Sequence, residues 1–203
     1  MNYNFIAPYY HSLSKLIFLN QQHKAHFLIL DQLKDGDKIL WVGGGAGKFI
    51  PEIDRLNLEI EIDYVDFSSK MIELAKKLKT THVYINFITA DIFNYKTENK
   101  YDVIITTFLF DHFTQQQAET LFERLYLFLK PNSIWFYVDF TQNQSKWQKQ
   151  VTQLMLSFFR IVIGLNINQL PKMNLVFEEK MKVYKTQKFF QNYIESIIYR
   201  NIT

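Results

Sequence analysis

The chain contains no cysteine among its 203 residues. A thiolate nucleophile, a disulfide framework and a cysteine-bound metal centre are therefore excluded. Only four prolines and six glycines interrupt the sequence, and it contains neither an internal repeat nor a Pro/Gly-rich linker. Because typical domains contain about 100–200 residues, we expect residues 1–203 to form a single domain.

An excess of charge and long apolar runs are also missing. The 23 basic and 20 acidic residues leave a net charge of +3, which is too small to indicate a nucleic-acid partner. The nearest candidate for a membrane span, from Val151 to Gly164, is interrupted by polar side chains and Arg160, so no transmembrane segment is expected. The first residues lack the pattern of a secretory signal, and we expect a cytoplasmic protein.

Apolar segments of strand length alternate with helical patterns along the chain. This alternation is typical of βαβ units and a parallel sheet. The fold class predicted is α/β: a doubly wound, mainly parallel seven-stranded sheet with helices on both faces and a terminal antiparallel hairpin. The strands are expected at Lys38–Val42, Glu59–Val65, His82–Ile88, Val103–Thr107 and Ile134–Val138, with the hairpin at Val183–Phe190 and Tyr193–Arg200.

Helices are expected between these strands. One is predicted over Ser68–Lys79, and a capping box of Thr114 and Gln117 opens another. The first 34 residues are expected to form one or two helices that cover the site, ahead of a core over residues 35–203. A long helix after the fifth strand is expected to present one apolar stripe, formed by Trp147, Val151, Leu154, Met155, Phe158 and Val162.

The strongest motif is the run Ile39-Leu40-Trp41-Val42-Gly43-Gly44-Gly45-Ala46-Gly47, in which a buried strand leads directly into G-x-G-x-G. Such a turn needs positive φ angles and a bare backbone, so a ligand can approach the main chain. A dinucleotide fingerprint would require a third glycine at Lys48 or Ile50, and neither is glycine. The motif present resembles motif I of the class I S-adenosylmethionine-dependent methyltransferases.

The rest of the sequence extends that resemblance. In this family an acidic residue closes the second strand and binds the ribose hydroxyls, which implies a cofactor site at Gly43, Gly45 and Gly47 together with Asp66 and Phe67. The family places another acidic residue after the third strand, near the adenine amino group. The corresponding pair here is Asp91 and Ile92.

The turn Phe110-Asp111-His112-Phe113, the leucine-lysine-proline turn before strand five and the opening Ile6-Ala7-Pro8-Tyr9-Tyr10 also fit the family. The opening is similar to that of the ubiquinone/menaquinone-biosynthesis-type branch, in which a tyrosine closes over the cofactor. Tyr10 is accordingly expected at the cofactor, and His112 is the candidate general base because histidine titrates near neutrality.

The resemblance implies methyl transfer from S-adenosyl-L-methionine to a small molecule. We expect an apolar or aromatic acceptor, because Leu156, Phe159, Ile161 and Ile163 add apolar surface to the long helix beyond one stripe. An ordinary buried helix, a homodimer contact and a membrane surface remain alternatives for that surface.

One position departs from the family. Trp41 stands where the family usually has an acidic residue that helps to anchor the methionine part of the cofactor. An indole offers at most a cation–π contact there. A catalytically degenerate protein that binds the cofactor or regulates a partner is therefore the alternative, and a nicotinamide oxidoreductase is a third hypothesis.

Two other pairs of residues have the spacing of a functional motif. His23 and His26 share one face of a predicted helix, but no third metal ligand is evident, so no metal is expected. Tyr126 and Lys130 form the Tyr-x-x-x-Lys pair of short-chain dehydrogenases. They lie before strand five and lack the dinucleotide fingerprint, so we interpret them as a helix face.

Overall fold

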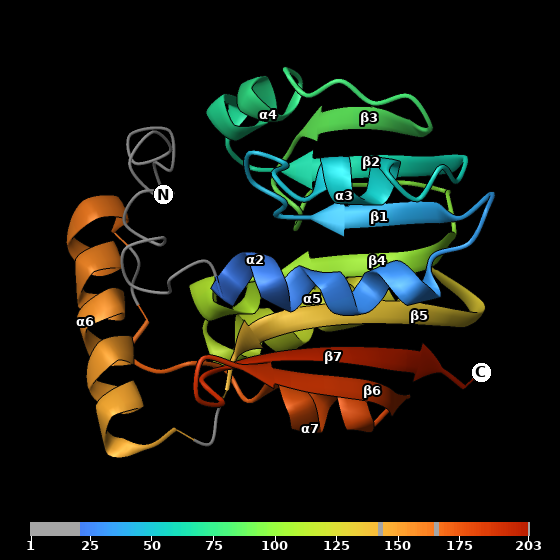
Figure 1. Cartoon of the computed structure of the whole chain (residues 1–203). Coiled ribbons are helices and arrows are strands. Elements are labelled where there is room, and N and C mark those ends of the chain that lie inside the picture. The colour runs from blue at the N-terminus through green and yellow to red at the C-terminus, as the bar shows by residue number, and fades with distance from the viewer. Residues whose placement is uncertain (1–20, 142–143, 165–166, 203) are drawn as a thin grey trace.

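In the computed structural model, which describes residues 21–141, 144–164 and 167–202, the backbone forms seven strands. They are β1 (Lys38–Val42), β2 (Ile60–Asp66), β3 (Val83–Thr89), β4 (Tyr101–Thr107), β5 (Leu129–Phe140), β6 (Met181–Phe189) and β7 (Ile194–Asn201). They pair in one sheet in the order β3-β2-β1-β4-β5-β7-β6 (Figure 1). β1 to β5 are parallel and β7 is antiparallel to both its neighbours. The predicted fold class is confirmed.

The helices lie on both faces of this sheet and at one edge. They are α2 (Gln21–Ala25), the 3-10 turns η1 (His26–Gln32) and η2 (Phe110–His112), α3 (Ile50–Asp54), α4 (Ser69–Ala75), α5 (Gln115–Tyr126), α6 (Lys146–Ile163) and α7 (Met173–Glu178). In Figure 1, α2 and α3 lie in front of the sheet, with α5 and α7 behind it. The predicted capping box of Thr114 and Gln117 opens α5.

Strand alternation divides the core between the two faces. On β1, Ile39 and Trp41 belong to one buried cluster, whereas Leu40 and Val42 belong to the other. The described part of the N-terminal segment packs on the first face, where Ser196 Oγ donates to the Ala25 carbonyl at 2.7 Å. The first twenty residues, Tyr10 among them, lie outside the described residues.

Strand five is longer than predicted. It begins at Leu129 and pairs there with Tyr101, but the register shifts before Val103 pairs with Ile134. The Pro131-Asn132 breaker therefore forms an irregularity inside β5 rather than preceding it. Asn132 adopts a φ of 58°, and asparagine is one of the few residues other than glycine that accepts this conformation readily. Asn132 therefore fits this place in the turn without backbone strain.

The C-terminal hairpin places β6 at one edge of the sheet. Its turn consists of Phe190, Gln191 and Asn192, all with positive φ, which agrees with the predicted break between the two strands. A register shift between Val183 and Lys185 adds a bulge to β6.

The apolar stripe predicted for the long helix is wrong as a core face. Among its described side chains, which exclude that of Val162, only Met155 is buried, whereas Leu154 is 71% exposed. The buried face of α6 consists of Gln148, Thr152, Met155, Leu156 and Phe159. Two polar side chains fix this orientation: Thr152 and Tyr193 share a hydroxyl–hydroxyl bond of 2.7 Å, and Gln148 donates to the Gln191 carbonyl at 2.9 Å. The side chain of Ile163 is not described.

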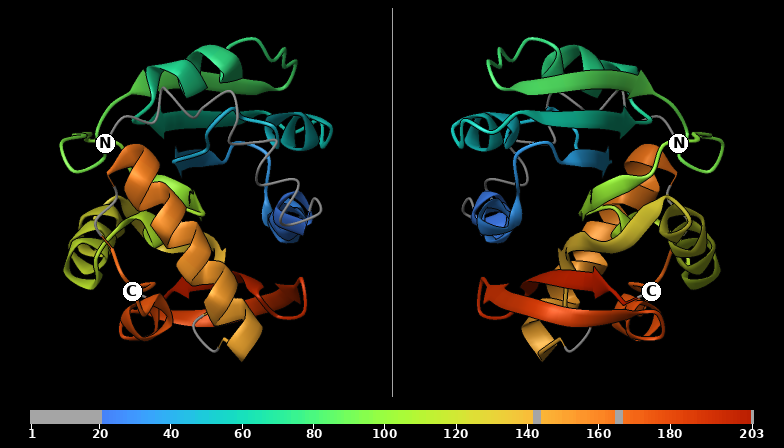
Figure 2. Two further views of the ribbon diagram at one scale, coloured as in Figure 1. Left: turned by 90° about the vertical axis from the view of Figure 1, so that its left-hand side faces the viewer. Right: turned by 90° about the vertical axis from the view of Figure 1, so that its right-hand side faces the viewer.

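α6 crosses the edge of the sheet at which the parallel strands end. The left panel of Figure 2 looks onto this carboxyl edge and shows α6 running across it. No helix in the described ranges has the length and apolar character that a membrane span requires.

Candidate active site

The glycine loop and Asp66 meet at the carboxyl edge of the sheet. Gly45 N–H donates to one Asp66 carboxylate oxygen at 2.9 Å, and Ser68 N–H donates to the other at 2.8 Å. The Tyr64 hydroxyl donates to the Gly45 carbonyl at 3.1 Å. Parallel pairing of β1 with β2 places the two strand ends side by side, so residues 21 apart in the sequence share one site.

The three predicted glycines all adopt positive φ, of 70°, 60° and 71° for Gly43, Gly45 and Gly47. They do so in different surroundings. A Cβ at Gly43 would lie 2.9 Å from Leu109, and one at Gly47 would lie 2.7 Å from Ile50. A Cβ at Gly45 would meet no atom within 4 Å. Packing therefore requires Gly43 and Gly47, whereas Gly45 presents bare backbone to open space, as a ligand site needs.

Gly44, which is not one of the three glycines of the G-x-G-x-G pattern, is required by Tyr64. A Cβ there would lie 2.3 Å from the tyrosine hydroxyl. The only sequence signal for this role is the uninterrupted run Gly43-Gly44-Gly45, in which the middle glycine leaves room for the Tyr64 side chain. The helix that follows, α3, begins only at Ile50 and has five residues, so the loop rather than a helix terminus offers the free backbone.

The surroundings of the Asp66 carboxylate both oppose and favour its charge. Burial raises the pKa of its carboxyl group, and the N–H groups of Ser68 and Gly45 together with His112 offset part of that rise. The carboxylate nevertheless has lone pairs left for further donors, since a carboxylate offers about four acceptor sites. The neighbouring Phe67 is 52% exposed at the same edge.

Asp91 and Ile92 are less clearly arranged for a ligand. Asp91 stabilises its own turn, because its carboxylate accepts the Phe93 N–H at 3.0 Å and its carbonyl accepts the Asn94 N–H at 2.9 Å. Ile92 is 6% exposed and packs in the second core cluster. Their role at the adenine remains a prediction.

Trp41 is buried in the first core cluster. It is 1% exposed, its ring lies 5.3 Å from that of Tyr64, and its Nε1 is buried without a hydrogen-bond partner. The ring thus has no accessible face for the cation–π contact that the sequence left open. At the position where the family usually has an acidic residue, this chain has a buried core side chain.

His112 lies in η2, directly after β4, and is covered by α6. Its ring packs 5.6 Å from that of Phe159, and its Nδ1 lies 2.8 Å from a carboxylate oxygen of the buried Asp111. Burial opposes the charged ring, but Asp111, the Leu109 carbonyl and Asp66 outweigh it and raise the pKa of His112. Asp111 lies in the same predicted turn as His112, but its burial depends on packing and has no local signal in the sequence.

Asp111→Asn is expected to lower the pKa of His112, because the ring then loses its nearest carboxylate while the cost of burial stays. NMR titration of the histidine rings, with His112→Gln assigning the signal, measures this. Asp139→Asn is the matched control. Burial and then Asp111 raise the pKa of Asp139 well above its ordinary value. The pKa of His112 is set by burial, Asp111, the Leu109 carbonyl and Asp66 rather than by Asp139, so Asp139→Asn should leave it unchanged. An unaltered His112 pKa in Asp111→Asn would contradict the pairing.

The residues set aside from the sequence have structural roles. His26 Nδ1 lies 2.7 Å from the Gln22 carbonyl and its ring packs on Phe49, and burial lowers its pKa to about 4. Within the described ranges no group of three His, Asp or Glu side chains could hold a metal ion.

Tyr126 and Lys130 do not share a helix face, contrary to the prediction, because Lys130 lies in β5. The Tyr126 hydroxyl donates to Asn201, and Lys130 pairs with Asp102 at 2.7 Å. Both serve the fold.

Comparison with known proteins finds similarity to methyltransferases. Residues 39–132 match a family described as methyltransferase domain. Malonyl-[acyl-carrier protein] O-methyltransferase 2 of Ilyobacter polytropus is 32% identical over 124 residues, which are 60% of this chain and 47% of that protein. Malonyl-[acyl-carrier protein] O-methyltransferase of Priestia megaterium is 38% identical over 93 residues, 46% of this chain and 33% of that protein. The chain thus spans about half the length, or less, of these curated relatives.

Solved structures share the fold at low sequence identity. The N-methyltransferase NodS of Bradyrhizobium japonicum WM9, in complex with S-adenosyl-L-homocysteine, has a TM-score of 0.64 at 14% identity and covers 90% of this chain and 86% of its own. The 1,6-didemethyltoxoflavin-N1-methyltransferase of Burkholderia thailandensis, with S-adenosylhomocysteine bound, has a TM-score of 0.68 at 11% identity, over 98% of this chain and 86% of its own. The finer likeness to the ubiquinone/menaquinone branch stays a prediction, since these relatives are named otherwise.

Proposed function

We propose that this chain, a class I S-adenosylmethionine-dependent methyltransferase by its domain and its fold, transfers a methyl group from S-adenosyl-L-methionine to a small apolar or aromatic molecule. The observation that carries the proposal is the bare backbone of Gly45 beside the Asp66 carboxylate. Because open α/β sheets bind ligands beyond the carboxyl ends of their strands, the place is the expected one.

The cofactor would supply an already activated methyl group on sulfur. This chain would then have three tasks: to hold the cofactor, to align the acceptor and to accept one proton. Gly45 and Asp66 would hold the cofactor through backbone contact and through hydrogen bonds to vicinal hydroxyls. Gly43 and Gly47 would maintain the loop. Phe67, Asp91, Ile92 and Tyr10 complete the proposed cofactor site.

His112 would accept the proton. Its raised pKa makes the neutral ring a stronger base but leaves less of it neutral near pH 7. If the chemical step limits the rate, turnover should therefore increase as the pH rises through the pKa of His112. The adjoining Phe159 ring supports an apolar or aromatic acceptor, because it lies against the proposed base.

The first test is a thermal-shift panel of S-adenosylmethionine, S-adenosylhomocysteine, NAD and NADP. A ligand at about 100 times its Kd stabilises a protein by about 2.7 kcal/mol. For a chain of this size that corresponds to an increase in Tm of about 5–10 °C. We expect this increase in Tm with S-adenosylmethionine and S-adenosylhomocysteine and not with NAD or NADP. A shift with NAD or NADP, or none with S-adenosylhomocysteine at millimolar concentration, contradicts the assignment.

A second candidate, a non-catalytic protein on the same scaffold, is favoured by the buried Trp41 in place of an acidic residue. Measuring release of S-adenosylhomocysteine distinguishes the two functions. An enzyme releases S-adenosylhomocysteine when given a lipophilic phenol or quinol, with a malonyl thioester as the comparison acceptor. A non-catalytic protein binds the cofactor and releases none with either.

A further inference from the structure

Helix α6 has a second apolar face, which the described residues leave partly or largely exposed, although the Trp147 ring also contacts those of Phe190 and Tyr193. Four large apolar side chains of this face are exposed: Trp147 by 37%, Leu154 by 71%, Phe158 by 36% and Ile161 by 84%. With the half-buried Val151 they recur at alternating intervals of four and three residues, which places them in one continuous stripe along the helix. Soluble proteins rarely expose an apolar stripe of this kind without a partner.

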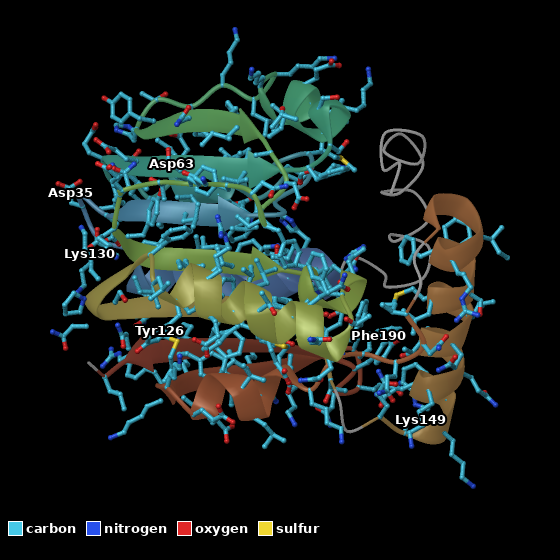
Figure 3. The ribbon with its side chains drawn as sticks, turned by 180° about the vertical axis from the view of Figure 1, so that it is seen from behind. Asp35, Asp63, Tyr126, Lys130, Lys149 and Phe190 are labelled. Carbon is cyan, nitrogen blue, oxygen red and sulfur yellow. The ribbon has the colours of Figure 1, made fainter. Side chains whose placement is uncertain are left out.

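The charges on the helix have a single sign. Lys146, Lys149 and Arg160 are exposed, and no Asp or Glu occurs between residues 146 and 163. Figure 3 shows Lys149 on α6 at the periphery of the molecule. Neither lysine forms an ion pair with a carboxylate of the described residues. Arg160 contacts the Ile167 carbonyl and Asn168, both uncharged, so its charge also remains.

This combination argues against a second copy of the chain on the stripe. Antiparallel pairing of two such helices would bring Lys149 of one copy near Arg160 of the other, and parallel pairing would align each cation with itself. Either arrangement brings positive charges together, and the helix has no carboxylate to neutralise them. Like charges held close together at an interface repel each other.

An anionic lipid surface satisfies both properties. Interfacial helices carry Trp, Phe and Leu on one face with Lys and Arg beside them, and they bind through apolar burial together with attraction to anionic headgroups. The position of α6 allows such contact. It is the outermost element at the carboxyl edge in Figures 1 and 2, where a planar surface can reach it.

We propose that the exposed face of α6 docks the protein on an anionic membrane surface. The opposite face of the same helix places Phe159 against His112, so docking would bring the proposed active site within one helix diameter of the lipid. An apolar acceptor dissolved in the membrane could then enter along α6. The docking goes beyond the proposed function and does not depend on it, because vesicle binding is measured without turnover.

The test is co-sedimentation of the full chain with two kinds of vesicle, one of phosphatidylcholine alone and one of equal parts phosphatidylcholine and phosphatidylglycerol. We expect binding to the anionic vesicles, weakened by salt, and little binding to the neutral ones. The double variant Leu154→Ser/Ile161→Ser should lower the partition coefficient at least about tenfold, since both side chains would lose their place in the lipid. Lys146→Glu/Lys149→Glu should lower it similarly.

The matched control variants make the same types of substitution at exposed positions outside α6. Leu175→Ser replaces another exposed leucine, 64% accessible on α7, and Lys96→Glu/Lys182→Glu reverses two exposed lysines outside α6. Both should bind as the unaltered protein does. Circular dichroism and S-adenosylhomocysteine binding check that each variant folds.

Three outcomes would overturn the proposal. One is no vesicle binding by the unaltered chain, and another is binding that the α6 variants and the controls reduce equally. The third is a dimer in solution that Leu154→Ser/Ile161→Ser dissociates, which would assign the stripe to a second copy.

Discussion

Asp66→Asn is expected to weaken S-adenosylhomocysteine binding about tenfold to a hundredfold. Hydrogen bonds to a charged group contribute about 1.5–3 kcal/mol, and 1.4 kcal/mol corresponds to a factor of ten in Kd. Gly45 and Ser68 donate to different oxygens of the carboxylate, and the amide keeps only one of them as an acceptor, so one of the two N–H groups loses its partner. Isothermal titration calorimetry measures the loss of affinity.

The stability of this variant depends on pH in a stated direction. Burial raises the pKa of Asp66 in the folded protein, so the contribution of Asp66 to folding is most favourable below its ordinary pKa of about 4 and decreases as the pH rises through the folded-state value. Asparagine never ionises. The variant should therefore gain in free energy of unfolding, relative to the unaltered protein, from about pH 4 upward, as urea titrations at several pH values would show.

Asp54→Asn is the opposite case and serves as the control. The Asp54 carboxylate accepts the N–H groups of Thr81, His82 and Val83 at 2.8–3.1 Å. Burial works against them, but together they lower its pKa. Its contribution is thus present above the ordinary pKa and lost as the pH falls. Asp54→Asn should lose stability at neutral pH and keep its cofactor affinity. Equal affinity in both variants would place the ligand away from Asp66.

Gly45→Asp is expected to reduce cofactor affinity more than about a hundredfold, which exceeds 2.7 kcal/mol. A side chain at Gly45 meets no protein atom, so it would stand in the space that a ligand must enter, and its charge would face Asp66. Gly36→Asp is a matched control. Gly36 also has a positive φ, of 79°, and open space around its Cβ position, but it lies in the turn before β1.

The two glycine variants should lose similar stability, about 1–2 kcal/mol, because each places a residue other than glycine in the left-handed region. Chemical denaturation measures that loss and calorimetry measures the affinity. The comparison separates backbone strain from obstruction of the site. If Gly36→Asp weakened binding as much as Gly45→Asp, the effect would come from the fold, and the open space at Gly45 would have no role in binding.

The sequence predicted most of the fold because strand periodicity and turn residues are local signals. β1, the order of helices and strands, and the terminal hairpin could all be read from runs of a few residues. The orientation of α6 could not, because both of its faces are apolar. Gln148 and Thr152, whose polar groups bind the hairpin region, decide which face is buried, and a hydrophobic pattern ranks such residues as exposed.

The site was predictable to the extent that one motif determines it. The positive φ angles of Gly43, Gly45 and Gly47 follow from the spacing, and parallel pairing brings Asp66 to Gly45. The buried pairing of Asp111 with His112 could not be predicted from the motif, since burial depends on the packing of α6 over η2. The places of Tyr10, a homodimer, the lack of a nucleic-acid partner and the cytoplasmic location remain predictions.

The bulge in β6 affects the colloidal behaviour of the protein. A strand at the edge of a sheet offers unpaired backbone groups that can template aggregation, and natural proteins counter this with lysines and irregular geometry. β6 has both: its register shifts between Val183 and Lys185, and Lys182 and Lys188 are exposed along it. Arg200 also covers the Tyr184 ring at 3.4 Å. Growth of the sheet by strand addition is thereby disfavoured at this edge, so the chain can keep a long antiparallel hairpin at its surface without recruiting further strands.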